Sequence, residues 1–442
     1  MLVMRYVAPD GRLVQIRPAR DNQPVNTRTS GGVLRRELGL LDAVGVGFGA
    51  IVGAGIFVVT GVAAGIAGPA FLAGLFVAAI AATCNALSSA QLAAEYPHSG
   101  GTYEYGYRVL NPWVGFAAGW MFLASKITAA GTVALGLAAY IDGLIPGLQP
   151  RVIAVAAITA FTALNYFGVR RSSRANLAIV TVSLGSLILF VIAGLPAFDA
   201  AHLRPFAPAG LRGTLESAAI LFFAYTGYAR IATLAEEVRE PRRTIPRATI
   251  ITIAGAVLLY FGVAVVAVGA VGAERMAATA APLQVAARAF GYSWVATAVS
   301  IGGVTAMLGV ILSQLLGLSR MGFAMARRGD LPRYLAAVHP RYAVPHRAVL
   351  VIGAIAAVVA ATGTLRGVAS AASFTILIYY GIANIAALRM PPAAKLYSDA
   401  IPVIGLVSCA LLALSLTPPV IAIGTALLAG GLIARWVVRR TQ

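Results

Sequence analysis

Residues 44–57 read VGVGFGAIVGAGIF, and this stretch of small and apolar residues decides the fold. Gly45, Gly49 and Gly53 recur at every fourth position, so they share one face of a helix. Such a face lets a neighbouring helix approach closely inside a membrane. The run GAG at 53–55 also has low helix propensity. We therefore expect a membrane-spanning helix that is either a close-packing seam or interrupted at this run, where freed backbone N–H groups would line a cavity.

The same apolar character recurs along the whole chain. Hydrophobic residues make up 59% of the 442 residues and charged residues only 11%, whereas a globular domain carries about 25% charged residues. A helix that crosses a bilayer needs about 20 apolar residues. About twelve runs are predicted as membrane-spanning helices by their hydropathy: 42–67, 71–93, 114–139, 152–167, 177–195, 215–235, 249–271, 294–325, 348–362, 369–388, 401–416 and 420–438.

Basic residues give the chain a formal net charge of +19. A charge of this size can indicate nucleic-acid binding, but the arginines concentrate in the N-terminal tail, in alternate loops and at the C-terminal end. This distribution follows the positive-inside rule and predicts that both termini are cytoplasmic. We expect an integral, multi-pass protein of the plasma (inner) membrane, in contact with the lipid bilayer and with no nucleic acid. Cys84 and Cys409 lie in separate apolar runs and predict neither a disulfide nor a metal site.

Residues 222–230 read FFAYTGYAR, a second apolar run with a glycine in its middle. It lies in the sixth predicted helix, whereas the run at 53–55 lies in the first. Matching interruptions at the start of two five-helix halves are typical of a transporter binding site. The chain has no GxxxxGK[ST] phosphate loop and no catalytic constellation. We therefore predict a protein that is not an enzyme and that needs no cofactor.

Four stretches, in the same order as in the family, resemble the amino acid–polyamine–organocation permeases. They are GAIVGAGIFVVTG at 49–61, AEYPHSGGTYEYGYRVLNPWVGFAAGW at 94–120, FFAYTGYARIATLAEEVREPRRTIPRA at 222–248 and SRMGFAMARRGDLPRYLAAVHPRYAVPHRA at 319–348. The resemblance implies an all-α fold in which helices 1–5 and 6–10 form an inverted repeat, the LeuT-like fold, followed by two peripheral helices. The corresponding segments are an arginine-rich cytoplasmic tail (1–38), a first repeat (39–195), a second repeat (196–389) that opens with an extracellular loop (196–214), and two C-terminal helices with a short cytoplasmic tail (390–442).

The resemblance also implies which residues bind the substrate. In this family the broken backbones of helices 1 and 6 hold the carboxylate and the amino group of an amino acid. The matching residues here are Ile51, Val52, Gly53, Ala54, Gly55, Phe223, Ala224, Tyr225, Thr226 and Gly227. For Phe223 and Tyr225, ordinary packing inside the bundle is the alternative interpretation.

Three further residues are candidates for ion coupling and gating. Lys126 lies near the middle of the third predicted helix, where a charge costs at least about 2.5–3.5 kcal/mol. It either exchanges a proton during transport or holds unwound carbonyls of helix 1 as a permanent cation. Arg230 stays protonated and is a candidate gate or counter-ion. Some proton-coupled family members carry a lysine where this chain has Ser183, so proton coupling through Lys126, coupling to Na⁺ and exchange without an ion all stay open.

Together these features predict a secondary active amino acid transporter that works by alternating access. Lys126 and Arg230 disfavour a cationic substrate, so we expect import of neutral L-amino acids with proton coupling. An amino acid exchanger and a polyamine or cationic amino acid permease are the alternatives within the same class. A sensor that binds an amino acid without moving it, or a channel, would belong to a different class.

Overall fold

The computed structural model describes residues 5–7, 13–15, 38–97, 100–168, 173–233 and 238–441. Most of the predicted cytoplasmic tail therefore lies outside the described residues. The chain divides into two units, Met1–Arg35 and Arg36–Gln442. In the first unit, strand β1 (Arg5–Val7) pairs antiparallel with strand β2 (Leu13–Gln15). This small pair of strands is a feature that the all-helical prediction lacks.

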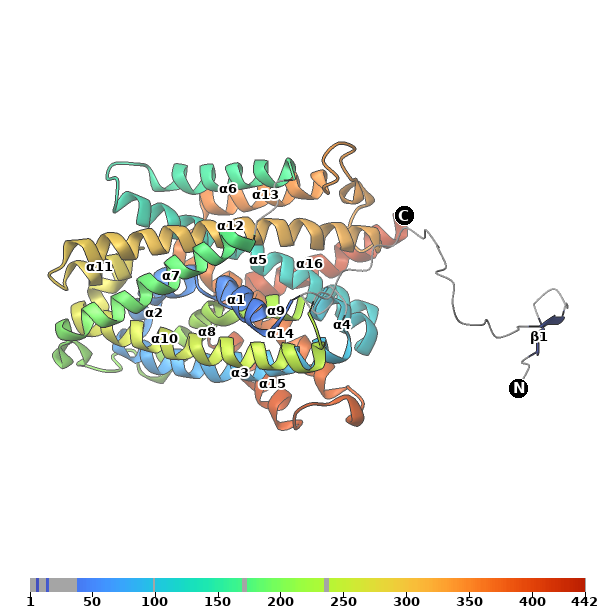
Figure 1. Ribbon diagram of the computed structural model, residues 1–442, viewed down its shortest axis with the longest axis horizontal. Coiled ribbons are helices and arrows are strands. Elements are labelled where there is room, and N and C mark those ends of the chain that lie inside the picture. Colours follow the sequence, from blue (N-terminus) through green and yellow to red (C-terminus); the bar gives the residue numbers. More distant parts are fainter. Residues whose placement is uncertain are drawn as a thin grey trace, which may run out of the picture. The chain divides into compact units, whose positions relative to one another are not determined.

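The named elements in the described part of the second unit are all helices, and the long ones run alongside one another (Figure 1). A helix lies at each predicted apolar run. The α-helices are α1 (Leu40–Ile51), α2 (Thr60–Ala67), α3 (Phe71–Glu95), α4 (Thr102–Tyr105), α5 (Pro112–Asp142), α6 (Pro150–Tyr166), α7 (Ser173–Gly194), α8 (Gly210–Tyr225), α9 (Ala229–Thr233), α10 (Pro241–Ala277), α11 (Pro282–Arg288), α12 (Ser293–Arg327), α13 (His346–Thr362), α14 (Leu365–Leu388), α15 (Ala400–Ser415) and α16 (Pro418–Thr441).

Within the described residues, seven helical segments are long and apolar enough to cross a membrane. They are Leu40–Glu95, Pro112–Asp142, Ala175–Ala197, Pro241–Ala277, Ser293–Arg327, Leu365–Leu388 and Pro418–Arg440. The first of them contains α1, α2 and α3, whereas α6, α13 and α15 are apolar but shorter. The protein is therefore a multi-pass helical membrane protein. That about twelve helices span the bilayer stays a prediction.

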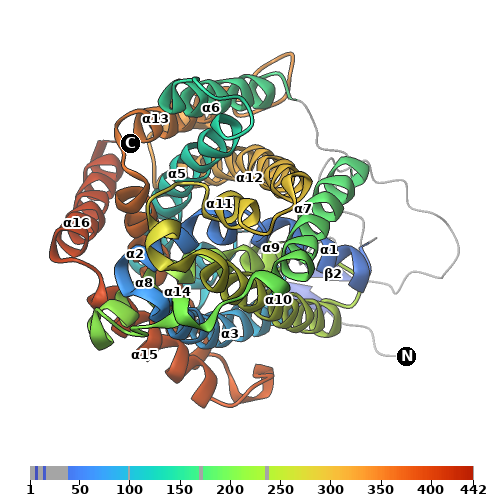
Figure 2. The ribbon, with the colours of Figure 1, turned by 90° about the vertical axis from the view of Figure 1, so that its left-hand side faces the viewer.

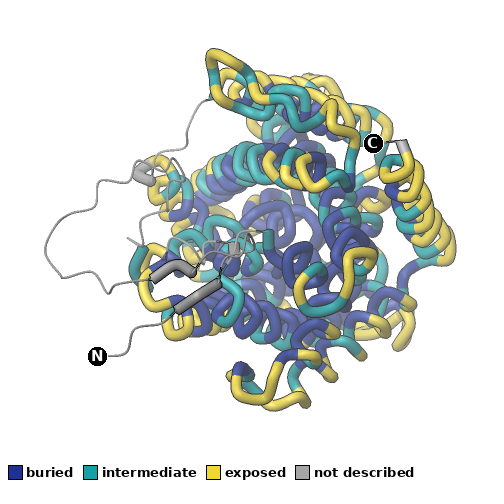
Figure 3. Tube along the Cα trace, turned by 90° about the vertical axis from the view of Figure 1, so that its right-hand side faces the viewer, coloured by how far each residue is buried: buried dark blue, intermediate teal, exposed yellow. Residues whose placement is uncertain are grey.

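The helices that carry the candidate site lie at the centre of the second unit. In its most apolar stretch, Leu365–Leu388 (α14) has 78% of its residues buried, whereas Pro418–Arg440 in α16 has only 17%. An end-on view places α6, α13, α15 and α16 at the outer edge (Figure 2). The view from the opposite end shows buried segments in the middle and exposed ones around them (Figure 3). The apolar outer faces of these helices are the surface that a bilayer would cover.

The start of α1 is fixed beside the start of α10. Leu38 forms a parallel bridge with Val238, and the backbone N–H of Arg239 donates to the Leu38 carbonyl at 3.0 Å. Arg242, in the first turn of α10, pairs with Glu95 at the end of α3 at 3.2 Å. These contacts hold the ends of three helices together.

Candidate functional site

The first predicted span is interrupted at the glycine-rich run. Helix α1 ends at Ile51, and Val52 has the extended dihedral angles φ −74° and ψ 110°. The chain resumes as a π-helical turn, η1 (Gly55–Val59), in which the N–H groups of residues 56 and 57 both donate to the Gly53 carbonyl at 3.2 Å. Within the described part of the chain, the N–H groups of residues 53–55 have no hydrogen-bond acceptor. Unpaired N–H groups at the start of a helical segment suit an anionic group.

The sixth predicted span also changes its winding, but it stays helical. Helix α8 ends at Tyr225, a 3₁₀ turn η6 (Thr226–Tyr228) follows, and α9 begins at Ala229. Both the N–H and the hydroxyl of Thr226 donate to the Phe223 carbonyl, the hydroxyl at 2.9 Å. This three-residue bonding tightens the turn instead of opening it. The interruption at Gly227 is therefore milder than the one in the first span.

Two glycines bring the two spans into direct backbone contact. A Cβ atom on Gly55 would lie 2.4 Å from the Cα of Ala224, and one on Gly227 would lie 2.3 Å from the carbonyl carbon of Ala50. A side chain cannot move aside at such distances because its neighbour is backbone. Glycine is therefore required at both positions, and the two interruptions face each other.

Three buried tyrosines donate hydrogen bonds to the backbone of the interrupted segments. Tyr260 in α10 donates to the Ile51 carbonyl at 2.8 Å, with the Ala224 carbonyl at 3.5 Å. Tyr140 in α5 donates to the Phe57 carbonyl at 2.7 Å, and Tyr380 in α14 donates to the Thr226 carbonyl at 3.2 Å. Sequence reasoning missed all three, because a tyrosine in an apolar run has no local signal that separates such a role from packing.

The structure brings Lys126 to the interrupted segments. Its Nζ lies 3.4 Å from the Thr226 hydroxyl oxygen and 6.0 Å from the centre of the Phe122 ring. Among the described residues, no carboxylate lies within the 4.0 Å ion-pair distance of this nitrogen. Lys126 thus joins helix α5 to the turn η6 without a counter-ion in the described part of the chain.

Three other candidate residues, Tyr225, Phe223 and Arg230, have different surroundings. Tyr225 is fully buried, its ring centre lies 5.4 Å from that of Tyr260, and its hydroxyl has no partner among the described residues. Phe223 is 9% exposed and lies in the same core. Arg230, in α9, points its guanidinium towards α12, where a Cβ on Gly317 would lie 3.4 Å from Nη1.

Ser183 is a residue of α7, and its side chain faces α12. Its hydroxyl donates to the Ile179 carbonyl at 2.7 Å and approaches the Gly302 carbonyl at 3.4 Å. Both acceptors are backbone carbonyls, one in α7 itself and one in α12. Its part in ion coupling stays a prediction.

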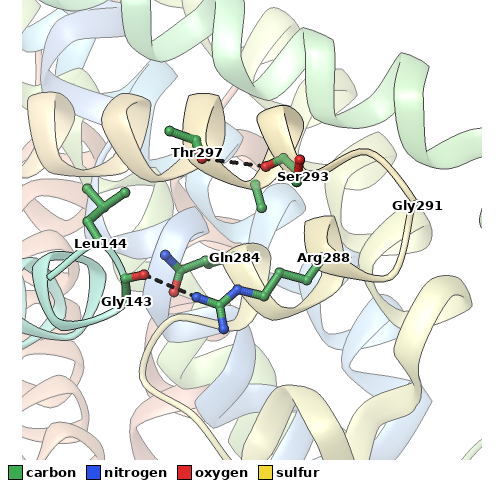
Figure 4. Close-up of a pocket in the computed structure, with 8 residues that line it drawn as sticks. Gly143, Leu144, Gln284, Arg288, Gly291, Ser293 and Thr297 are labelled. Atoms are coloured by element: carbon green, nitrogen blue, oxygen red, sulfur yellow. Dashed lines mark hydrogen bonds between the residues drawn. The ribbon is translucent and has the colours of Figure 1, made fainter. Parts of the chain in front are cut away.

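A separate cavity of about 410 Å³ lies where the end of α5 meets α11 and the start of α12 (Figure 4). Arg288 reaches from α11 towards the end of α5 and donates from Nη2 to the Gly143 carbonyl at 3.1 Å. Gln284 lies in its wall and donates to the Ser300 hydroxyl at 2.7 Å. None of its lining residues belongs to the interrupted segments, so this cavity is not the predicted substrate site.

Known sequences resemble the chain over almost its whole length. A profile of the family described as amino acid permease matches residues 38–433. An uncharacterized transporter of Mycobacterium tuberculosis is 45% identical over 420 residues, which cover 95% of this chain and 94% of the relative. The branched-chain amino acid permease BcaP of Bacillus subtilis is 30% identical over 375 residues, 80% of this chain and 81% of the relative.

A plant relative is named for a different class of amino acid. The vacuolar cationic amino acid transporter 4 of Arabidopsis thaliana is 31% identical over 351 residues, which cover 74% of this chain and 58% of the relative. The family match and the relatives agree with the interrupted spans in pointing to a transporter instead of an enzyme. The chain belongs to the amino acid permease family, within the amino acid–polyamine–organocation superfamily.

Proposed function

We propose that this permease is a secondary active transporter that imports neutral L-amino acids by alternating access and couples their movement to protons. The observation that carries the proposal is the interruption of the first span. Three consecutive N–H groups, at residues 53–55, have no acceptor in the described part of the chain. They suit the carboxylate of an amino acid, because aligned N–H groups at the start of a helical segment attract negative charge.

The surroundings of this segment fit a small zwitterionic substrate, which carries a carboxylate and an ammonium group. Tyr225, the last residue of α8, and Thr226, the first of η6, carry hydroxyl groups, and the Tyr225 hydroxyl has no partner among the described residues. The unpartnered Tyr225 oxygen is the acceptor for the substrate's ammonium group, because the Thr226 oxygen already contacts the Lys126 ammonium. A ring at Phe223 supplies an apolar surface for the substrate side chain.

Lys126 favours a neutral over a cationic side chain on the substrate. Its ammonium group lies 3.4 Å from Thr226 and has no carboxylate within ion-pair distance in the described residues. A second cation next to it would be repelled, since electrostatic interactions are strong at bilayer depth. BcaP, named for branched-chain amino acids, agrees with this choice, whereas the plant relative named for cationic amino acids supports the alternative.

Proton coupling is assigned to the same lysine. Lys126 has no carboxylate partner among the described residues, and a cation in that state inside a membrane protein is costly, so it can release its proton while the substrate site is empty. Ser183 has no titratable proton in this range, so we place the coupling on α5. We also propose that about twelve helices span the plasma (inner) membrane as a five-plus-five inverted repeat and two peripheral helices, with both termini in the cytoplasm.

Uptake into proteoliposomes tests the proposal. A panel of radiolabelled neutral, cationic and acidic amino acids is offered with and without an inward proton gradient, to the wild type, Lys126→Ala and Lys126→Arg. We expect the gradient to stimulate uptake of neutral amino acids, and both variants to lose this stimulation. Lys395→Ala is the matched control, because Lys395 is the chain's other lysine and pairs with Asp399 at 2.5 Å outside the site.

Other outcomes select the alternatives. Uptake that ignores the gradient but rises with amino acid loaded inside the vesicles identifies an exchanger. Stimulation by an inward Na⁺ gradient alone moves the coupling from H⁺ to Na⁺. Binding without uptake under any condition contradicts transport and favours a sensor.

A further inference from the structure

A buried ion pair joins the last helix to the end of α12. Arg435 in α16 donates from Nε to Oδ1 of Asp330 at 2.9 Å, and the two side chains are 1% and 0% exposed. Removing two charges from water costs several kcal/mol per ion, which an ion pair offsets only when its remaining polar atoms are also bonded. A pair this deeply buried on an otherwise peripheral helix therefore needs further partners.

Arg439, also in α16, donates from Nη2 to Oδ1 of Asp330 at 3.3 Å, and the other partners of Asp330 come from the segment between α3 and α5. Tyr103 in α4 donates to Oδ2 of Asp330 at 2.8 Å, and Tyr107, in the π-helical turn η3 (Gly106–Leu110), donates to the same oxygen. Arg435 also donates from Nη2 to the Tyr107 hydroxyl at 2.8 Å. Its guanidinium lies over the ring of Trp113, at the start of α5, at 4.5 Å. We call the cluster of Asp330, Arg435, Tyr103 and Tyr107 the Asp330 lock.

A short chain of contacts leads from this lock to the candidate site. Thr102, next to Tyr103, donates its backbone N–H to the hydroxyl of Tyr379 in α14 at 3.2 Å. The rings of Tyr379 and Tyr380 lie 5.1 Å apart. Tyr380 donates to the Thr226 carbonyl at 3.2 Å, inside the turn that also contacts Lys126. The lock and the substrate turn therefore share a run of packed and hydrogen-bonded groups.

We propose that the Asp330 lock is a positioning device for the substrate site. Through it, α16 holds α4 against α14, and α14 in turn holds Tyr380 on the Thr226 carbonyl. The last helix thus contributes to substrate binding although it lies at the edge of the bundle. The second half of this inference rests on the proposed function, whereas the hold of α16 on α4 does not.

Matched arginine substitutions in α16 test the proposal. Arg435→Lys keeps the charge but loses the forked contacts to Asp330 and Tyr107. Arg440→Lys is the control: it is the same change five residues further along, at an arginine that lies over the Trp436 ring at 3.7 Å. Asp330→Asn removes the negative charge of the pair, whereas Asp330→Glu keeps a carboxylate at this position. Asp399→Asn, the same change at another aspartate, is the control for Asp330→Asn.

The first measurement follows α4 itself. A cysteine is placed at Thr102 in a background in which Cys84 and Cys409 are replaced by alanine, and its reaction with N-ethylmaleimide is timed. Arg435→Lys loses hydrogen bonds of the buried pair, and Asp330→Asn loses its negative charge. Because either change destabilises this region locally, we expect labelling to become about 10-fold faster in both variants. Labelling in Arg440→Lys and Asp399→Asn should stay within about twofold of the parent, because both side chains are exposed. Asp330→Glu keeps the carboxylate and should label more slowly than Asp330→Asn.

The second measurement follows the site. Equilibrium binding of radiolabelled leucine should weaken about 10-fold in the two lock variants, with the number of sites per protein unchanged. Unchanged labelling in Arg435→Lys overturns the proposal, and so does faster labelling with unaltered leucine affinity, because the lock would then not reach the site. Should the wild type bind no amino acid, the proposed function fails, and the labelling rates alone decide whether α16 holds α4.

Discussion

Gly55 has the tightest steric requirement of the candidate binding residues in the first span. In Gly55→Ala the new methyl group meets the Cα of Ala224 at 2.4 Å. Overpacking against backbone costs about 1–3 kcal/mol, so we expect a lower melting temperature and the loss of most uptake. Thermal unfolding in detergent and proteoliposome uptake measure the two effects.

Gly45→Ala provides the comparison within the same span. Nothing lies within 4 Å of a Cβ at Gly45, and alanine favours the helix by about 1 kcal/mol over glycine. This variant should keep its uptake and should melt at the same or a slightly higher temperature. Equal losses in both variants would show that the two interrupted spans do not meet as described.

The buried tyrosines form hydrogen bonds that a single sequence does not predict. Tyr260 lies 209 residues from Ile51 in the chain, and yet its hydroxyl donates to the Ile51 carbonyl. Interruption of α1 frees this carbonyl, and a buried carbonyl without a donor costs about 1–3 kcal/mol. Glycine spacing predicts that such carbonyls exist, but it does not predict which helix supplies the donor.

At the scale of the element, the two interruptions differ for a local reason. The first span contains two glycines around Ala54 and opens into an extended residue at Val52. The second contains Thr226, whose hydroxyl and N–H both bond to the Phe223 carbonyl, so that turn stays wound. The positions of both interruptions could be predicted from their glycines. The degree of opening could not, because it depends on side-chain bonding to the backbone.

Helix α4 carries a carboxylate whose charge stabilises the fold. Glu104 accepts hydrogen bonds from Arg108 at 2.6 Å and from Arg328 at 2.7 Å. Burial alone would raise the pKa of this carboxyl, but the two arginines outweigh burial and hold the pKa below its usual value. The stabilisation is therefore fully present above the unfolded-state pKa of about 4.3 and disappears as the pH falls through the lower folded-state pKa.

Glu104→Gln should accordingly lower the melting temperature at about pH 7, and the gap to the wild type should close as the pH falls below the unfolded-state pKa of about 4.3 and through the lower folded-state pKa. Melting curves across this range in detergent measure the difference. Glu274→Gln, at an exposed position in α10, should give no gap at any pH. A gap for Glu104→Gln that stays constant with pH would mean that shape, and not charge, is what Glu104 contributes.

At the scale of the whole molecule, the distribution of arginine predicts the orientation. Both termini should lie on the cytoplasmic side, since basic residues concentrate there. An epitope tag at either end should therefore be cleaved by an added protease in inside-out vesicles and be protected in right-side-out vesicles. Cleavage of the two tags in opposite preparations would require an odd number of spans, and would contradict the proposed arrangement of about twelve.

The sequence predicted the helical class far better than the contacts between helices. Hydropathy located a helix at each predicted run, because a bilayer imposes long apolar segments. The pairing of Asp330 with Arg435, 105 residues away, had no such signal: in one sequence both read as ordinary loop or helix-end charges. Lys126 stood out because charge is rare inside an apolar run, and the structure places it against Thr226.

The contact between the two interrupted spans has a consequence for how this family can diversify. Gly55 meets Ala224, and Gly227 meets Ala50, through main-chain atoms that every amino acid shares. As long as these glycines are retained, a bulky side chain nearby, such as that of Phe223, can be substituted without removing the main-chain contact between the two spans. A relative that keeps both glycines can therefore differ from this chain in its substrate and still pack its two interrupted spans in the same way.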